Sequence, residues 1–206
     1  MVIDVGGVNM KLGILYDSSE TDSCALYASA LAAAEGKADR IETIDVSEAA
    51  SAPCICCFQC WTKTPGVCVL PRDGGTRYVE KFWDADCLLI ISRVRWGGYT
   101  TPIKSYIDRL IPGLHPYFTK RNGEMHHKFR YGSIPLMLAV GYGAASPGEV
   151  ATFRAYTQAN RDQRGTTRDT GTLVVERGLD ATSGAAEECT RWLESELREI
   201  GKEARK

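Results

Sequence analysis

Five consecutive residues near the middle of the chain, Cys87-Leu-Leu-Ile-Ile91, are all apolar. A strand with one face in water would alternate, so this run predicts a central parallel strand that helices cover on both sides. Residues 41–46 do alternate between apolar and polar side chains, which predicts a half-buried strand near the edge of the same sheet. The two patterns together indicate a sheet with a covered centre and a more exposed margin.

Strand and helix signals alternate along the rest of the 206 residues. Further strands are expected at residues 12–16, 134–140 and 172–175, and helices at 23–34, from 101, at about 147–163 and near the C-terminus. Such alternation predicts parallel strands with helices on both faces. The right-handed crossover rule then favours the flavodoxin-like strand order 2-1-3-4-5, an α/β three-layer sandwich, in a single domain over residues 1–206.

The net charge of −1 gives no global field for nucleic acid, and no apolar stretch is long enough to cross a membrane. The N-terminus does not resemble a secretion signal, so we expect a cytoplasmic protein. In that reducing compartment cysteines are thiols or ligands rather than disulfides.

Five of the eight cysteines fall within fifteen residues, in PCICCFQCWTKTPGVC. Cys54, Cys57, Cys60 and Cys68 have the spacing C-x2-C-x2-C-x7-C, which suits an iron–sulfur cluster, with Cys56 as a bystander. A zinc site and free or redox-active thiols are the alternatives. This cysteine-rich loop spans about residues 53–72.

Ligands of doubly wound sheets bind beyond the carboxyl ends of the strands, where three loops stand out. The first contains Ser18, Thr21 and Ser23, which could hold a phosphate or simply cap a helix, although Glu20 and Asp22 would repel a dianion. The second offers planar and small groups in the order Arg93, Val94, Arg95, Trp96, Gly97, Gly98. The third contains Tyr142 and Gly143, and is either a ligand loop or a tight turn.

Residues 113–133 are polar, aromatic and irregular in pattern, and we expect an excursion or lid there. Lys104 and Arg109 lie on the helix after the second loop and are expected to be surface charges.

The segments PCICCFQCWTKTPGVC and SRVRWGGYTTPIKSYIDRL resemble the NADPH-dependent FMN reductase-like branch of the flavodoxin-like superfamily, which includes the iron–sulfur flavoproteins. The resemblance implies FMN with its phosphate at Ser18, Thr21 and Ser23, and its ring between residues 93–98 and Tyr142–Gly143. It also implies a [4Fe–4S] cluster on the four cysteines, and a homodimer or homotetramer. The acidic first loop, and Arg93 where many relatives have proline, depart from the family pattern.

The sequence therefore predicts an FMN-dependent oxidoreductase or electron-transfer flavoprotein, with NAD(P)H or ferredoxin as donor and a small molecule such as a quinone as acceptor. Residues 113–133 would gate the site, together with a second subunit. The alternative is a flavodoxin-like protein without FMN that acts as a thiol redox sensor or a zinc-binding module.

Overall fold

The computed structural model describes residues 10–49, 51–70, 73, 82–121, 123–132, 135–162, 171–176 and 184–203. Five parallel strands form its central sheet, in the order β2 (Arg40–Asp45), β1 (Lys11–Tyr16), β3 (Cys87–Arg93), β6 (Leu136–Tyr142) and β7 (Thr172–Val175). The predicted flavodoxin-like order is confirmed. The expected positions Ile134 and Gln163, at the ends of a strand and a helix, lie outside the described residues, as do residues 71 and 72 of the cysteine loop.

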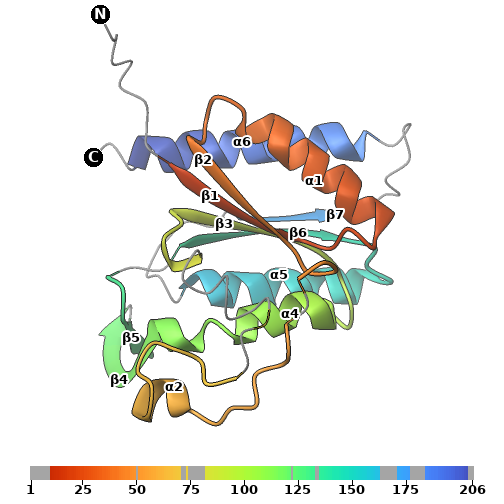
Figure 1. Ribbon diagram of the computed structural model, residues 1–206. Coiled ribbons are helices and arrows are strands. Elements are labelled where there is room, and N and C mark those ends of the chain that lie inside the picture. Colours follow the sequence, from red (N-terminus) through yellow and green to blue (C-terminus); the bar gives the residue numbers. More distant parts are fainter. Residues whose placement is uncertain are drawn as a thin grey trace, which may run out of the picture.

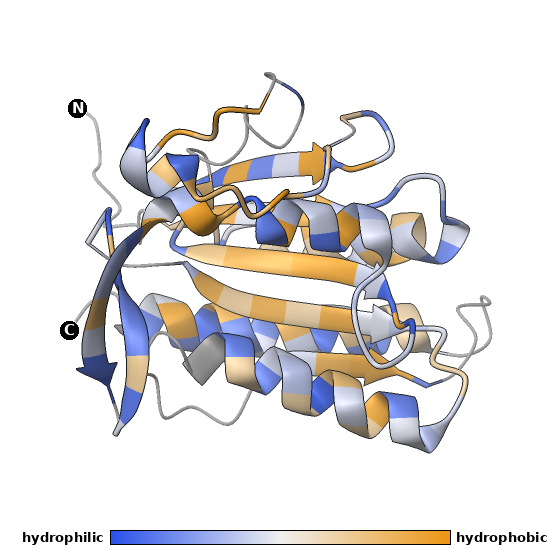
Figure 2. Ribbon diagram, turned by 90° about the horizontal axis from the view of Figure 1, so that it is seen from below, coloured by the Kyte–Doolittle hydropathy of each residue, from blue (hydrophilic) through white to orange (hydrophobic). Residues whose placement is uncertain are grey.

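Helices cover both faces of this sheet (Figure 1). α1 (Thr21–Ala34) and α6 (Ala185–Glu203) lie above it in the view of Figure 1, and α4 (Thr101–Asp108) and α5 (Pro147–Asp162) lie below. The apolar run of β3 is buried on both sides, which Figure 2 shows as a continuous hydrophobic band through the middle of the sheet. Burial on two faces explains why this strand shows no alternation.

The segment expected to be irregular is a β-hairpin, so that prediction is wrong. After the short helix η1 (Ile111–Gly113), β4 (Leu114–Arg121) pairs antiparallel with β5 (Glu124–Phe129). Arg121 faces Glu124 across the turn, and Gly123 has a φ of 87°. The sequence Asn122-Gly123 is a strong hairpin signal that the broad polar composition of this stretch concealed.

The hairpin lies at the amino-end edge of the sheet, because α4 runs back across the sheet from the carboxyl end of β3. Figures 1 and 2 show β4 and β5 on the left, opposite the arrowheads of the sheet strands. The hairpin therefore lies away from the candidate flavin loops of its own chain, and gating of a flavin site by residues 113–133 together with a second subunit stays a prediction. The cysteine loop, with its single-turn helix α2 (Gln59–Thr62), lies beside the hairpin.

Among the described helices, none combines the length and the apolar character that crossing a membrane would need.

Candidate flavin site and cysteine loop

The second loop forms a tight turn directly after β3. Arg95 N donates to Gly98 O at 3.0 Å and Gly98 N donates to Arg95 O at 2.8 Å. The two central residues both have positive φ, 54° for Trp96 and 74° for Gly97, as a two-residue hairpin turn requires. Trp96 is 93% exposed at the tip. A bulky residue in this left-handed region costs about 1–2 kcal/mol, and such strain is typical of functional sites.

Side chains of α5 fix this turn, which we call the ring loop (Arg95–Gly98). The Glu149 carboxylate accepts a hydrogen bond from Trp96 N at 3.0 Å and another from Ala145 N at 2.6 Å. A methyl group on Gly97 would lie 2.4 Å from Thr152 Cγ2, so only glycine fits here. Glu149 thus ties the ring loop to the loop after β6. Sequence reasoning missed this residue, although Ser146-Pro-Gly-Glu149 has the spacing of a capping box.

The other predicted ring contacts divide into buried and accessible groups. The side chain of Val94 is 1% exposed and packs in the core under α5, so it offers a ligand only its backbone. Gly143 is exposed and has a φ of 64°, which leaves open backbone beside the ring loop. Tyr142, at 2% exposure, points its ring toward Arg93, whose guanidinium carbon lies 5.4 Å from the ring centre.

The predicted phosphate loop is occupied by its own side chains. Ser18 N donates to Asp45 Oδ1 at 3.0 Å, and Ser19 N donates to Asp17 Oδ1 at 3.0 Å. Asp17 N donates to the hydroxyl of Ser23 at 3.1 Å. Burial acts to raise the pKa of Asp45, but hydrogen bonds from Ser18 and Ser47 outweigh it, and the net shift is downward. Thr21 begins α1, where first-turn amides have no intrahelical acceptor.

Arg93 turns away from the ring loop and pairs with the first loop. Its Nη2 and Nε lie 2.6 and 3.0 Å from Oε2 of Glu20, and Nη2 is 4.0 Å from Asp22. The hydrogen bond that Arg93 donates to Glu20 raises the pKa of Arg93. Burial, and then the nearby charge of Glu20, raise the pKa of Tyr142 to about 12. The hydroxyl of Tyr142 is therefore neutral at physiological pH and lies among these charged groups.

The two halves of the site thus fit FMN differently. The ring half presents glycine backbone and an exposed aromatic side chain, Trp96, which suit a flat ligand. In the phosphate half, the amides of Ser18 and Ser19 donate to Asp45 and Asp17, and the guanidinium of Arg93 donates to Glu20. In this conformation the ring half fits the cofactor and the phosphate half does not.

All five loop cysteines line a second, small cavity under the end of α4, together with Asp108, Arg109, Ile111 and Pro112. Cys56 and Phe58 both have positive φ, 50° and 54°, so the backbone bends sharply between the first ligand candidates. Cys60 is buried, Cys54 and Cys68 are half-buried, and Cys57 is exposed. The five thiols thus border one cavity, and ligation of a metal or cluster by four of them stays a prediction.

The space between the thiols is too small for a four-iron cube. The cavity measures ≈ 20 Å³, and about 10–15 Å³ is needed for one water molecule. Burial raises the pKa of the Cys54 and Cys60 thiols, and neighbouring thiols raise that of Cys60 further. Within the described ranges, no three His, Cys, Asp or Glu side chains are grouped to hold a metal ion. The raised pKa favours the neutral form of Cys54 and Cys60, and the loop as folded does not fit the cluster.

Arg109 joins the two ends of the cysteine loop and is not the surface charge that was expected. Its side chain is 1% exposed. Nη1 and Nη2 donate to the carboxylate of Asp73 at 3.0 and 3.1 Å, and Nη1 also donates to Ala52 O at 2.9 Å. Asp73 in turn accepts from Ala52 N at 2.8 Å. We call this group the Arg109 bridge. Lys104, as expected, lies at the surface, where it pairs with Asp108.

The ring loop and the cysteine cavity lie at opposite ends of α4. The helix has 8 residues, which corresponds to a length of about 12 Å. It begins at Thr101, just after the ring loop, and the residues at its end line the cysteine cavity. The cysteines are thus separated from the ring loop by roughly the length of this helix.

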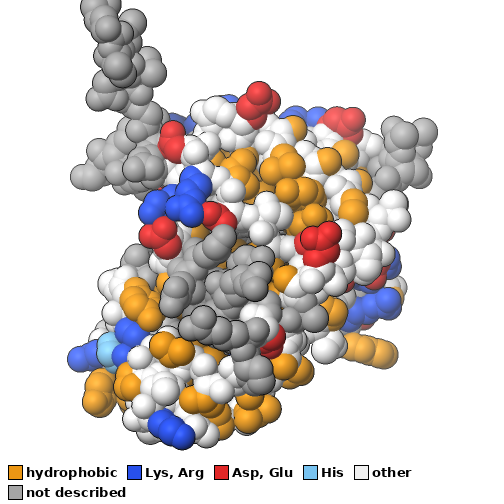
Figure 3. Space-filling model, viewed as in Figure 1, with side chains coloured by type: hydrophobic (Ala, Val, Ile, Leu, Met, Phe, Trp, Pro, Cys, Tyr) orange, Lys and Arg blue, Asp and Glu red, His pale blue; other side chains and the backbone are white. Residues whose placement is uncertain are grey.

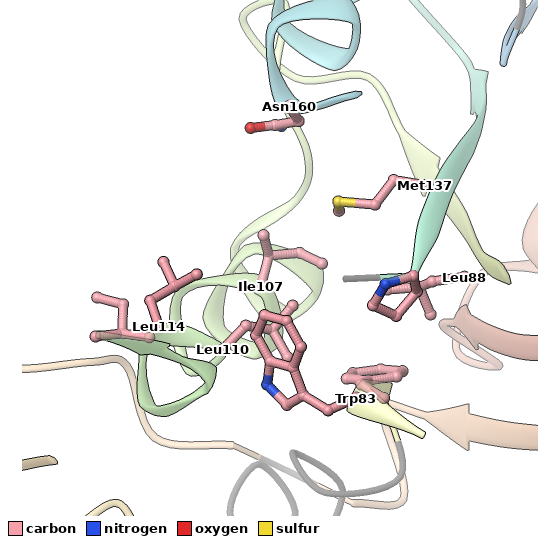
Figure 4. A pocket seen from close by; sticks show the side chains of 10 residues that line it. Trp83, Leu88, Ile107, Leu110, Leu114, Met137 and Asn160 are labelled. Carbon is pink, nitrogen blue, oxygen red and sulfur yellow. The ribbon is translucent and has the colours of Figure 1, made fainter. Parts of the chain in front are cut away.

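Another cavity, of ≈ 150 Å³, does not border either loop (Figure 4). It lies near the amino ends of β3 and β6, where Leu88 and Met137 face Ile107, Leu110 and Trp83. Its lining is apolar except for Asn160, so it lacks the charged and polar groups that would orient a cofactor.

The fold and the ring half of the site define a flavodoxin-like protein with a candidate flavin site at the carboxyl ends of its strands. Residues 10–161 match the family described as NADPH-dependent FMN reductase, and the chain belongs to this family. No functionally curated protein matches the sequence.

Solved structures share the fold at low identity. An NAD(P)H:quinone oxidoreductase from Methanothermobacter marburgensis superposes with a TM-score of 0.67 at 15% identity, over 93% of this chain and 97% of its own. An FMN-dependent NADH-azoreductase from Bacillus anthracis, in complex with FMN, gives 0.61 at 13%, over 94% and 99%. The flavoenzyme NAD(P)H:(acceptor) oxidoreductase FerB from Paracoccus denitrificans gives 0.53 at 12%, over 94% and 96%.

Proposed function

We propose that this protein is an FMN-dependent oxidoreductase that takes electrons from NAD(P)H and passes them to a small acceptor such as a quinone. The observation that carries the proposal is the ring loop, a strained turn that Glu149 and Thr152 fix at the carboxyl end of the central strand. The family supports FMN and NAD(P)H. The quinone oxidoreductase and azoreductase folds support a small, flat acceptor.

The protein's part in this reaction is to position the flavin and tune it. FMN, when bound, supplies the hydride and electron chemistry. The backbone of Gly98 and Gly143 would lie along the ring, and Trp96 would cover one side of it. Arg95, next to Trp96, would place a positive charge near the ring and so favour its reduced, anionic form.

The test is a titration of the purified protein with FMN, followed by stopped-flow reduction with NADPH or NADH. We expect quenching of flavin fluorescence on binding, and bleaching of the flavin band by at least one of the nicotinamides. A protein that binds no flavin would contradict the proposal. It would favour the alternative of a thiol redox sensor, which is supported by the exposure of Cys56 and Cys57.

A [4Fe–4S] cluster on Cys54, Cys57, Cys60 and Cys68 stays a prediction, and so does ferredoxin as a donor. The convergence of the four thiols on one cavity supports the cluster, but the loop would have to open before a cube could enter. We derive no step through it. Iron analysis of anaerobically purified protein decides the point, since the cluster would give about four irons per chain.

We also propose a cytoplasmic homodimer or homotetramer. Large apolar side chains are exposed on the cysteine loop and the hairpin, among them Ile55, Phe58, Tyr117, Phe118 and Met125. The lower part of Figure 3 shows hydrophobic side chains gathered there. Exposed apolar groups in one region are typical of protein interfaces. Light scattering coupled to size-exclusion chromatography would give the mass, and a monomer would contradict this assembly.

A further inference from the structure

The ion pair between Arg93 and Glu20 stands where the flavin phosphate is expected. Glu20 is the residue that precedes α1, and Arg93 is the last residue of β3, 73 positions away in sequence. Both side chains are about 70% buried, with exposures of 28% and 30%. The positively charged side chain of Arg93 contacts this loop, and it already donates two hydrogen bonds to the carboxylate of Glu20.

Two of the loop's amides, those of Ser18 and Ser19, are committed in the same way. The carboxylates of Asp45 and Asp17 accept from the backbone N–H groups of Ser18 and Ser19. A phosphate that bound these two amides would compete with the carboxylates for them, and it carries a charge of about −1.5 to −2 at neutral pH. Three carboxylates therefore take the place of the phosphate oxygens, and they would also repel a phosphate that approached.

We propose that Glu20 is a built-in competitor for the flavin phosphate, so that this site selects flavins by their ring and binds riboflavin about as well as FMN. The proposal rests on the proposed flavin site and adds to it the class of flavin accepted. The phosphate can accept hydrogen bonds from Arg93 only after Glu20 has released it. Replacing the carboxylate by the phosphate therefore contributes little net binding free energy. The ring half of the site, which Glu149 fixes, is the same for both flavins.

The experiment compares the dissociation constants of FMN and riboflavin for the wild type and for Glu20→Gln. The amide keeps the size of the side chain but loses the charge, which frees Arg93 and removes a repulsion. In the wild type the two constants should agree within about threefold. In Glu20→Gln, FMN should bind at least about tenfold more tightly, the worth of one charge-assisted hydrogen bond, and riboflavin should be unchanged.

Three variants make the result specific. Glu194→Gln removes an equally sized carboxylate from the ion pair with Lys37 on another face, and should leave both constants unchanged. Asp22→Asn, at 4.0 Å from Arg93, should shift FMN in the same direction by less. Adding Arg93→Gln to Glu20→Gln should abolish the gain in FMN affinity. Asp22→Asn also keeps the test valid if Glu20→Gln unfolds the loop.

A wild type that binds FMN more than about thirtyfold more tightly than riboflavin would overturn the inference, because the phosphate would then contribute a full set of hydrogen bonds. An equal change for both flavins in Glu20→Gln would also overturn it, since Glu20 would then act on the ring half. Failure of both flavins to bind any of the proteins would overturn the proposed function itself, and the inference with it.

Discussion

The ring loop and the cysteine loop are joined by the same helix, α4, but they are held in different ways. The ring loop is a four-residue turn whose own backbone bonds, a close glycine contact and the Glu149 carboxylate fix every residue. The cysteine loop is long, and the Arg109 bridge ties it mainly at its two ends. A short loop fixed throughout suits a ligand that must be placed accurately. A long loop fixed at its base keeps several thiols together without fixing their geometry.

The largest expected effect comes from breaking the Arg109 bridge with Arg109→Leu. Removing one partner of a buried ion pair costs about 3–5 kcal/mol of unfolding free energy, because Asp73 loses both guanidinium donors and Ala52 O loses the donor Nη1. Urea denaturation followed by tryptophan fluorescence would measure this loss. Thiol titration should also show faster reaction of the loop cysteines.

The matched control lies one turn earlier on the same helix. Lys104→Met breaks an exposed pair with Asp108 and should cost less than about 0.5 kcal/mol. Equal losses in the two variants would mean that Arg109 does not join the ends of the loop.

The ring loop can be tested by adding one methyl group. Gly97→Ala combines a left-handed backbone with a 2.4 Å approach to Thr152, and should cost about 2–4 kcal/mol and weaken flavin binding. Gly123→Ala has the same kind of backbone, with a φ of 87°, but no atom within 4 Å. This control should cost about 1–2 kcal/mol and leave flavin binding intact. Thermal unfolding and FMN titration would separate the two, and similar flavin affinities would show that the ring does not contact this turn.

A smaller effect is expected for Glu149→Gln, which keeps the shape of the side chain that joins the ring loop to Ala145. The bonds lie near the solvent, so we expect a loss of about 1 kcal/mol in stability and a severalfold weaker binding of FMN. Glu187→Gln, in the first turn of α6, removes the same favourable charge from a helix N-terminus and serves as the control. If both variants bind FMN equally well, Glu149 does not position the ring loop.

The smallest effect concerns the pH dependence of the cysteine loop. Burial raises the pKa of Cys60 above its ordinary value of 9.0. The neutral thiol therefore favours the folded loop below pH 9, and this contribution is lost as the pH rises through the raised pKa. Alkylation with iodoacetamide should reach the exposed Cys57 first and Cys60 only at higher pH, as fragment mass spectrometry would show. Added FMN should not change this order, because the proposed flavin site lies at the other end of α4.

Most of the fold could be predicted because burial leaves a direct pattern in the sequence. The apolar run at Cys87 became β3, and the alternating run became the edge strand β2. The hairpin was missed because β4 and β5 form their own small sheet with partly exposed faces, so neither strand has a clear apolar side. Only the Asn122-Gly123 pair signalled it.

The site could be located from the sequence but its contacts could not. The three loops follow the carboxyl ends of strands, and the order of elements places them together. The partners of their charged side chains come from far along the chain: Glu20 for Arg93, and Asp73 for Arg109. The residues next to these arginines in the sequence do not distinguish them from surface charges. The sequence accordingly predicts Arg93 as a contact of the flavin ring and Arg109 as a surface charge.

The sequence by itself determined the strand order, the positions of the loops and the family, because these depend on periodicity and on motifs within short stretches. Only the tertiary structure decided which charged side chains form ion pairs with one another. It paired Glu20 with Arg93 in the phosphate half of the candidate site and buried Arg109 at the base of the cysteine loop. It also separated the cysteine loop from the ring loop by the length of α4. The physical reason is that ion pairing and burial depend on distances in space, which the folding of the sheet sets and sequence spacing does not.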